Sequence, residues 1–190
     1  MSDKSVANIL SPRLEFHEVL GFWFGELSDS DRWSKGKLLD PVIKTRFAVF
    51  HAAAGSGELW EWRTSPEGRL AEIIVLDQFS RHLYRNTPQA FASDATALVL
   101  AQESVRVGAD QTVDEEKRQY FYMPFMHSES LRIHESASGL FARLPGNLKY
   151  AVKHREIIER FGRYPHRNSI LGRVSTPAEV EFLKTPGSSF

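Results

Sequence analysis

Apolar residues recur every three to four positions along most of the chain, the spacing that places them on one face of an α-helix. No segment alternates apolar and polar residues between turn signals, so no sheet is predicted. Because the connections are short and no fixed-period repeat occurs, we expect one all-α domain over residues 1–190, with loose ends at about 1–10 and 185–190. The predicted helices are 12–24, 41–54, 66–84, 88–107, 115–122, 128–144, 148–161 and 177–184, with Glu58–Arg63 as one further turn.

Prolines and glycines place the ends of these helices. Proline suits the first turn because its missing N–H would have no partner there. Pro124, by contrast, is expected to break the helix that precedes it. Five prolines follow a residue that can cap a helix: Ser11-Pro12, Asp40-Pro41, Ser65-Pro66, Thr87-Pro88 and Thr176-Pro177, the last with Glu179 completing a capping box. The glycines expected to end helices are Gly25, Gly55, Gly108 and Gly162.

The 66–84 helix is apolar around most of its circumference and is expected to be the most buried. It carries Asp77 and Arg81, four residues apart with the acid first, the favourable order for an ion pair. The two are either a structural pair or a device that orients a charged ligand. The large apolar residues expected to be mostly buried are Trp23, Phe24, Phe47, Ile74, Phe79, Phe121, Phe125, Leu140, Phe141, Ile157, Ile158 and Phe161.

Three further polar residues interrupt apolar surface. His154 lies in the middle of a helix face, where a histidine is either a neutral core residue or a tuned proton-transfer group. His127 and Glu129 lie where a helix is expected to begin, and Glu129 there also suits the helix dipole. An ionised group buried alone loses its hydration without replacement. We therefore expect the helices to meet, with a carboxylate of Asp77 or Glu129 within hydrogen-bonding distance of His127, His154 or Arg81.

The loop after Phe161 is basic and rigid. Between residues 153 and 173 the chain carries six Lys/Arg and two Glu. Arg163 complements the negative end of a helix, whereas His166 and Arg167 suit an anion, for which arginine offers a planar fork. We expect the loop to close the polar cluster, with Arg163 or Arg167 facing a cavity. An Arg167→Ala change should then weaken anion binding and leave thermal stability nearly unchanged.

Composition narrows the class of protein. The formal net charge is zero, from 24 basic and 24 acidic residues, which argues against binding to nucleic acid or to a membrane surface. The absence of cysteine excludes disulfides and thiolate chemistry. Apolar runs are too short to cross a bilayer and no signal-peptide pattern is present, so a soluble cytoplasmic protein is expected. A monomer and a homo-oligomer are both left open by the sequence.

Familiar catalytic motifs are missing. The chain contains no P-loop, no G-x-G-x-x-G, no G-x-S-x-G and no H-E-x-x-H, so no cofactor is indicated. A metal site built from Asp77, His127, Glu129 and His154 is an alternative, but the spacing of these residues is not that of a known metal motif. No metal is therefore predicted.

Several strings nevertheless resemble one family. They are Val19–Gly25, Leu76–Phe79 with Tyr84-Arg85, Tyr122–Phe125 with His127–Glu129, Phe161–Asn168, Leu171–Arg173 and Ser175–Pro177. Together they resemble the mainly bacterial domain-of-unknown-function family 924 over about residues 16–183. The resemblance implies antiparallel helix pairs in a tetratricopeptide-like superhelix, and it implies no activity. The chain departs from the family pattern at Ser80, His82, Met126, Ser130 and His134, which weakens any site that needs carboxylates at positions 126 or 130.

Two functions remain open. The first is a small-molecule binding protein or enzyme, with an anionic metabolite held in a pocket between helices. Its acid–base candidates are Asp77, His127, Glu129 and His154, and its ligand-binding candidates are Arg81, Arg163, His166 and Arg167. The second is a non-catalytic helical adaptor that binds a peptide or protein, for which Trp33, Trp60 and Trp62 are candidates. A closed pocket lined by His and Arg favours the first, and an open groove lined by Trp and Leu favours the second.

Overall fold

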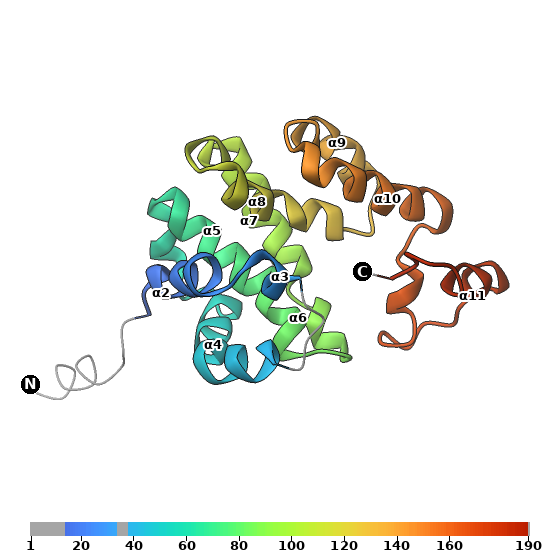
Figure 1. Ribbon diagram of the computed structural model, residues 1–190, viewed down its shortest axis with the longest axis horizontal. Helices are drawn as coiled ribbons and strands as arrows, with labels where there is room; N and C mark the ends of the chain where they lie inside the picture. The colour runs from blue at the N-terminus through green and yellow to red at the C-terminus, as the bar shows by residue number, and fades with distance from the viewer. Residues whose placement is uncertain (1–13, 34–37, 190) are drawn as a thin grey trace, which may run out of the picture.

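The computed structural model describes residues 14–33 and 38–189, and this part of the chain contains helices and no strand (Figure 1). The prediction of an all-α domain is confirmed. The α-helices are α2 (Phe16–Leu20), α3 (Asp29–Arg32), α4 (Leu39–Gly55), α5 (Pro66–Ile74), α6 (Ser80–Leu83), α7 (Asp94–Arg106), α8 (Glu115–His127), α9 (Leu131–Phe141), α10 (Pro145–Phe161) and α11 (Pro177–Leu183). Helices adjacent in sequence pack together, α7 on α8, α8 on α9 and α9 on α10.

Short helical segments of other types join these helices. Tighter 3₁₀ turns lie at Trp60–Thr64, Pro88–Phe91, Ala109–Thr112 and Pro165–Arg167, and wider π-helical segments lie at Gly21–Glu26 and Val75–Phe79. The second π-helical segment links α5 to α6, so the predicted 66–84 helix is one continuous rod with a widened turn. Such turns are rare and frequently lie at functional sites, and this one contains Asp77.

Two of the predicted caps form as expected. The Ser65 hydroxyl accepts from the Gly68 N–H at 3.0 Å, and Thr176 forms a capping box with Glu179. Gly108 and Gly162 follow α7 and α10 with φ of 75° and 66°, a conformation that glycine adopts without strain. The other predicted caps in the described part of the chain do not form. Asp40-Pro41 lies inside α4, Thr87 makes no side-chain cap, and Gly25 and Gly55 lie within helical segments rather than after them. Ser11-Pro12 and residues 1–10 lie outside the described residues.

The prediction that Pro124 ends its helix was wrong. Helix α8 continues through Pro124 to His127, and α9 begins only at Leu131. Proline removes one backbone hydrogen bond, but every residue from Tyr120 to Met126 is buried, so packing holds the last turn in place. The error matters because it places His127 at the end of a helix rather than at the start of one. The predicted 88–107 helix is likewise divided, into a 3₁₀ turn and α7.

The apolar core gathers around the rod formed by α5 and α6. All residues from Leu70 to Ser80 are buried, which confirms that this is the most buried helix. Of the residues predicted to be buried, Phe24, Leu140 and Phe161 are half-buried and all the others are buried. The helix faces were therefore interpreted correctly.

A second, smaller apolar cluster lies in the C-terminal part of the chain. It consists of Ile157, Ile158 and Tyr164, with Phe161 and Phe182 packed against them. In Figure 1 this region, coloured orange to red, lies toward the side of the molecule where α11 is labelled. The segment that follows Tyr164 supplies one wall of the site described next, through Arg167 and Leu171.

Candidate functional site

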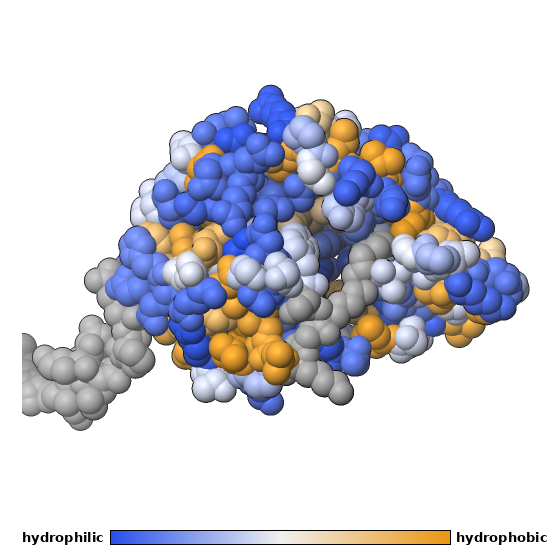
Figure 2. All heavy atoms as spheres, viewed as in Figure 1, coloured by the Kyte–Doolittle hydropathy of each residue, from blue (hydrophilic) through white to orange (hydrophobic). Residues whose placement is uncertain are grey.

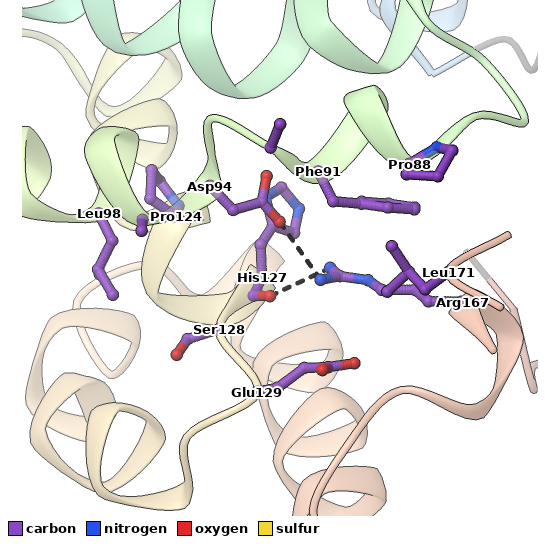
Figure 3. A pocket seen from close by; sticks show the side chains of 12 residues that line it. Pro88, Phe91, Asp94, Leu98, Pro124, His127, Ser128, Glu129, Arg167 and Leu171 are labelled. Carbon is purple, nitrogen blue, oxygen red and sulfur yellow. Dashed lines mark hydrogen bonds and ion pairs between the residues drawn. The ribbon is translucent and has the colours of Figure 1, made fainter. Parts of the chain in front are cut away.

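A cavity of about 400 Å³ lies between the N-terminal end of α7, the C-terminal end of α8 and the segment from Pro165 to Leu171 (Figure 3). Most of its wall is apolar and comes from Pro88, Phe91, Ala92, Ala95, Leu98, Pro124 and Leu171. Its polar lining consists of Asp94, His127, Ser128, Glu129 and Arg167. Mostly apolar walls with a few convergent polar groups are typical of small-molecule sites.

An aspartate–histidine pair lies at the inner edge of this cavity. His127 Nδ1 lies 2.6 Å from Asp77 Oδ1, although the two residues are fifty positions apart. The Asp77 side chain is only 1% exposed, and its second oxygen accepts from the Gln78 amide. This contact confirms the expectation that a carboxylate of the polar cluster bonds a histidine.

The charges around the pair determine its protonation. Burial alone would raise the pKa of Asp77, but His127, through its charge when protonated and through its hydrogen bond, and the Arg81 guanidinium bring it well below its usual range. Burial lowers the pKa of His127 and outweighs the attraction of Asp77. At neutral pH the pair is therefore an ionised carboxylate and a neutral imidazole. Because a carboxylate only accepts, the imidazole proton lies on Nδ1, which leaves a lone pair on Nε2.

His127 is partly exposed and lines the cavity. The side chain is 16% exposed, and no residue in the described ranges hydrogen-bonds to Nε2. Asp77 thus fixes both the orientation and the tautomer of a ring whose free nitrogen can accept a proton.

Asp94 and Arg167 line the cavity beside His127, and Arg81 bonds Asp94 from outside the cavity lining. Arg81 donates to both oxygens of Asp94, at 3.0 and 3.2 Å, and to the backbone oxygen of Asp77 at 2.6 Å. Its distance to the Asp77 carboxylate is 3.4 Å. The predicted Asp77–Arg81 pair therefore exists, but Asp94 is the partner that Arg81 holds with two bonds.

Arg167 reaches the same carboxylate from the C-terminal segment. Its guanidinium donates to Asp94 at 3.3 Å and to the backbone oxygen of His127 at 3.1 Å, as the dashed lines in Figure 3 mark. It also lies over the rings of Phe91 and Tyr164, 4.5 and 4.7 Å from their centroids. Because Arg167 is buried and packed between rings, we now expect Arg167→Ala to lower stability, contrary to the sequence-based expectation.

Glu129 anchors the C-terminal segment to the end of α8. It accepts two bonds from Arg173, at 2.6 and 2.9 Å, and a third from the Tyr164 backbone N–H at 2.8 Å. The Tyr164 hydroxyl donates to the backbone oxygen of Met126. Glu129 lines the cavity, but with both oxygens engaged it is a positioning group rather than an acid or base.

The other candidates lie outside the cavity lining. Arg163 donates to Glu179 at 2.7 and 2.8 Å. His154 bonds the Tyr150 backbone oxygen at 2.7 Å and packs edge-on against Tyr164. His166 contacts the ring of Tyr164 at 5.6 Å between centroids. His154 and His166 therefore lie close to the site, behind Tyr164, but neither lines it.

Sequence reasoning missed the groups that link the site together. The sequence candidates did not include Asp94, Arg173 or Tyr164. Asp94 is already explained as an acid in the first turn of α7, where it suits the helix dipole. In the described part of the chain, no three His, Asp or Glu side chains are grouped so that they could hold a metal ion. The four residues of the alternative metal site are thus not gathered around one point.

The family model described as "Bacterial protein of unknown function (DUF924)" matches residues 19–187. The chain belongs to this family. The match contains every residue that lines the cavity, and it confirms the resemblance seen in the sequence. No curated protein matches the chain significantly.

A solved structure is similar to this DUF924 chain over most of its length. It is a protein of unknown function, ATU0120, from Agrobacterium tumefaciens, 38% identical in sequence. The similarity covers 89% of this chain and 96% of that one, with a TM-score of 0.86. Within the part of the DUF924 chain that the structure describes, no helix is both long and apolar enough to span a membrane.

Proposed function

We propose that the cavity is the site of an enzyme that acts on a small organic molecule, with His127 as the proton-accepting group. The observation that carries the proposal is the Asp77–His127 hydrogen bond, which presents an unprotonated Nε2 to a cavity. A buried ion pair would satisfy Asp77 without a histidine, and a core histidine would not need an open nitrogen. An oriented and partly desolvated imidazole is the usual arrangement for general base catalysis.

The chemistry that follows is a proton transfer. His127 Nε2 takes a proton from the bound molecule or from a water beside it, which gives an imidazolium. Asp77 stays ionised and stabilises that charge across the 2.6 Å hydrogen bond. The proton returns to product or solvent from the same nitrogen, so that His127 ends each cycle neutral.

The ligand class proposed is a small anion with an apolar part. Phe91, Leu98 and Leu171 offer apolar contact, and Arg167 supplies the cation. The Nε–H of Arg167 is buried and has no hydrogen-bond partner among the described residues. A buried unpaired donor costs about 1–3 kcal/mol of stability. A small shift of Arg167 that lets its Nε–H donate to a ligand acceptor would recover this free energy. The cavity volume of about 400 Å³ suits a metabolite rather than a polymer.

The test uses molecules that the protein retains. Small molecules are extracted from purified wild-type protein and from His127→Gln, identified by mass spectrometry, and then incubated with each protein. We expect the same compound in both extracts, converted by the wild type and not by the variant. The exposed His17→Gln is the matched control and should behave as wild type. The proposal would be contradicted if His127→Gln converted the compound as fast as the wild type. It would also be contradicted if the wild type retained no compound, or retained one that it did not convert.

A peptide-binding adaptor is the second candidate. Trp33 and Trp60 are 54% and 61% exposed, whereas Trp62 is buried and bonds the Leu14 backbone oxygen. Hydrophobic residues also gather at the lower edge of Figure 2, where Figure 1 places α4, with Leu38 and Val49 exposed. A tetratricopeptide-like superhelix stays an expectation. Because neither exposed tryptophan lines the His127 cavity, the small-molecule function is the better supported.

A further inference from the structure

Asp94 is the residue on which Arg81 and Arg167 converge. It lies in the first turn of α7, its side chain is 17% exposed, and it lines the cavity beside Arg167 (Figure 3). Arg81 binds it through two bonds from behind, and Arg167 binds it through one bond from the cavity side.

The two arginines depend on Asp94 to different degrees. The contact from Arg167 is the longer, at 3.3 Å, and it is not what places the guanidinium. Arg167 is held in addition by the backbone oxygen of His127 and by the rings of Phe91 and Tyr164. Asp94 therefore compensates the charge of Arg167, whereas the other contacts fix the position of its guanidinium.

Charge balance shows what this means for a ligand. The acids of the site are Asp77, Asp94 and Glu129, and its guanidiniums are Arg81, Arg167 and Arg173. With His127 neutral, three negative and three positive groups cancel. An anion that enters the cavity is thus an uncompensated charge, and it must share Arg167 with a carboxylate that already binds it.

We propose that Asp94 is the specificity-determining residue of this cavity, because its carboxylate competes with the anionic group of a ligand for Arg167. This inference rests on the proposed function of the cavity. Asp94 weakens the binding of anions relative to neutral molecules of the same shape, so only a ligand that also gains apolar contact binds well. Asp94 acts through Arg167 and need not touch the ligand.

The experiment compares a charged and a neutral probe of matched shape. Benzoate and benzamide are titrated into the wild type and Asp94→Asn, and binding is followed by the ring resonances of His127, assigned with His127→Gln. The amide keeps the size of Asp94 and removes its charge. We expect Asp94→Asn to bind benzoate about five- to tenfold more tightly, while the affinity for benzamide changes less than about twofold. Glu103→Gln removes an acid from the same helix outside the cavity lining, and should leave both affinities unchanged.

Each other outcome overturns the inference in a distinguishable way. Equal or weaker benzoate binding by a folded Asp94→Asn would show that Asp94 places Arg167, and the proposed function would stand. If no probe shifts the His127 resonances in any variant, the proposed cavity function fails and this inference fails with it. Cooperative unfolding checks that the variants fold, and Asp94→Ser repeats the test with a smaller side chain. Loss of folding in both would identify Asp94 as a structural counter-charge and overturn the inference.

Discussion

The pH dependence of stability tests whether His154 is a neutral core residue. His154 is buried against Tyr164, and burial lowers its pKa to about 3, with the neighbouring histidines acting in the same direction. In the unfolded chain its pKa is about 6.5. Between these values the unfolded chain binds a proton that the folded protein does not, so stability falls as the pH is lowered through this window. Above pH 6.5 or so the two states carry the same charge at this residue.

The size of the effect follows from the two pKa values. Each pH unit below 6.5 costs roughly 1.4 kcal/mol, so His154 alone removes about 3 kcal/mol of unfolding free energy by about pH 4.5. Glu179, whose pKa is lowered to about 2, chiefly by the hydrogen bond from Arg163, begins to lose its contribution only below about pH 4.5. Between about pH 6.5 and 4.5 the change in unfolding free energy therefore comes mainly from the histidines.

The assay is urea unfolding followed by circular dichroism at several pH values in this window. His154→Asn removes the titration while its amide can still donate to the Tyr150 backbone oxygen in place of Nδ1. We expect the variant to lose about 3 kcal/mol less than the wild type over the window, whatever its stability at neutral pH. His17→Asn, at an exposed position, should follow the wild type. Parallel curves for His154→Asn and the wild type would refute the assignment of His154 as a neutral core residue.

Four further substitutions test the core and the anchor at Glu129. Phe121 is fully buried, and Phe121→Ala should cost about 3–5 kcal/mol in a denaturant titration; a cost below about 1 kcal/mol would contradict the core as described. Trp62→Ala should cost a similar amount and Trp60→Ala less than about 1 kcal/mol, and equal losses would show that the two tryptophans are not differently buried. Glu129→Gln should lower the melting temperature and increase proteolysis between α10 and α11, because it weakens the bonds from Arg173; unchanged proteolysis would argue against Glu129 as the anchor.

The fold could be predicted where local signals agree with packing. The burial of the rod around Ile74, the cap at Ser65 and the capping box at Thr176 all follow from neighbouring residues in the sequence. Pro124 shows the limit, because a local rule predicted a break that the burial of Tyr120 to Met126 overrides. Burial of that kind depends on distant parts of the chain, which a local pattern does not report.

The site could be predicted in part for a similar reason. Asp77 and His127 were recognisable because a polar residue on an apolar face needs a partner. Asp94 gave no such signal, since an acid in the first turn of a helix is already explained by the helix dipole. The sequence also did not predict that Arg163 binds Glu179 instead of facing the cavity. Glu179 was already explained as part of a capping box.

The protonation state of His127 tests the central claim most directly. Nitrogen-15 NMR of the imidazole, assigned with His127→Gln, reports which ring nitrogen carries the proton and how the ring titrates. The account predicts a neutral ring at pH 7 or so with the proton on Nδ1, a pKa below the usual 6.5, and loss of this tautomer preference in Asp77→Asn. A ring that is cationic at neutral pH, or protonated on Nε2, would contradict the account, because no lone pair would then face the cavity.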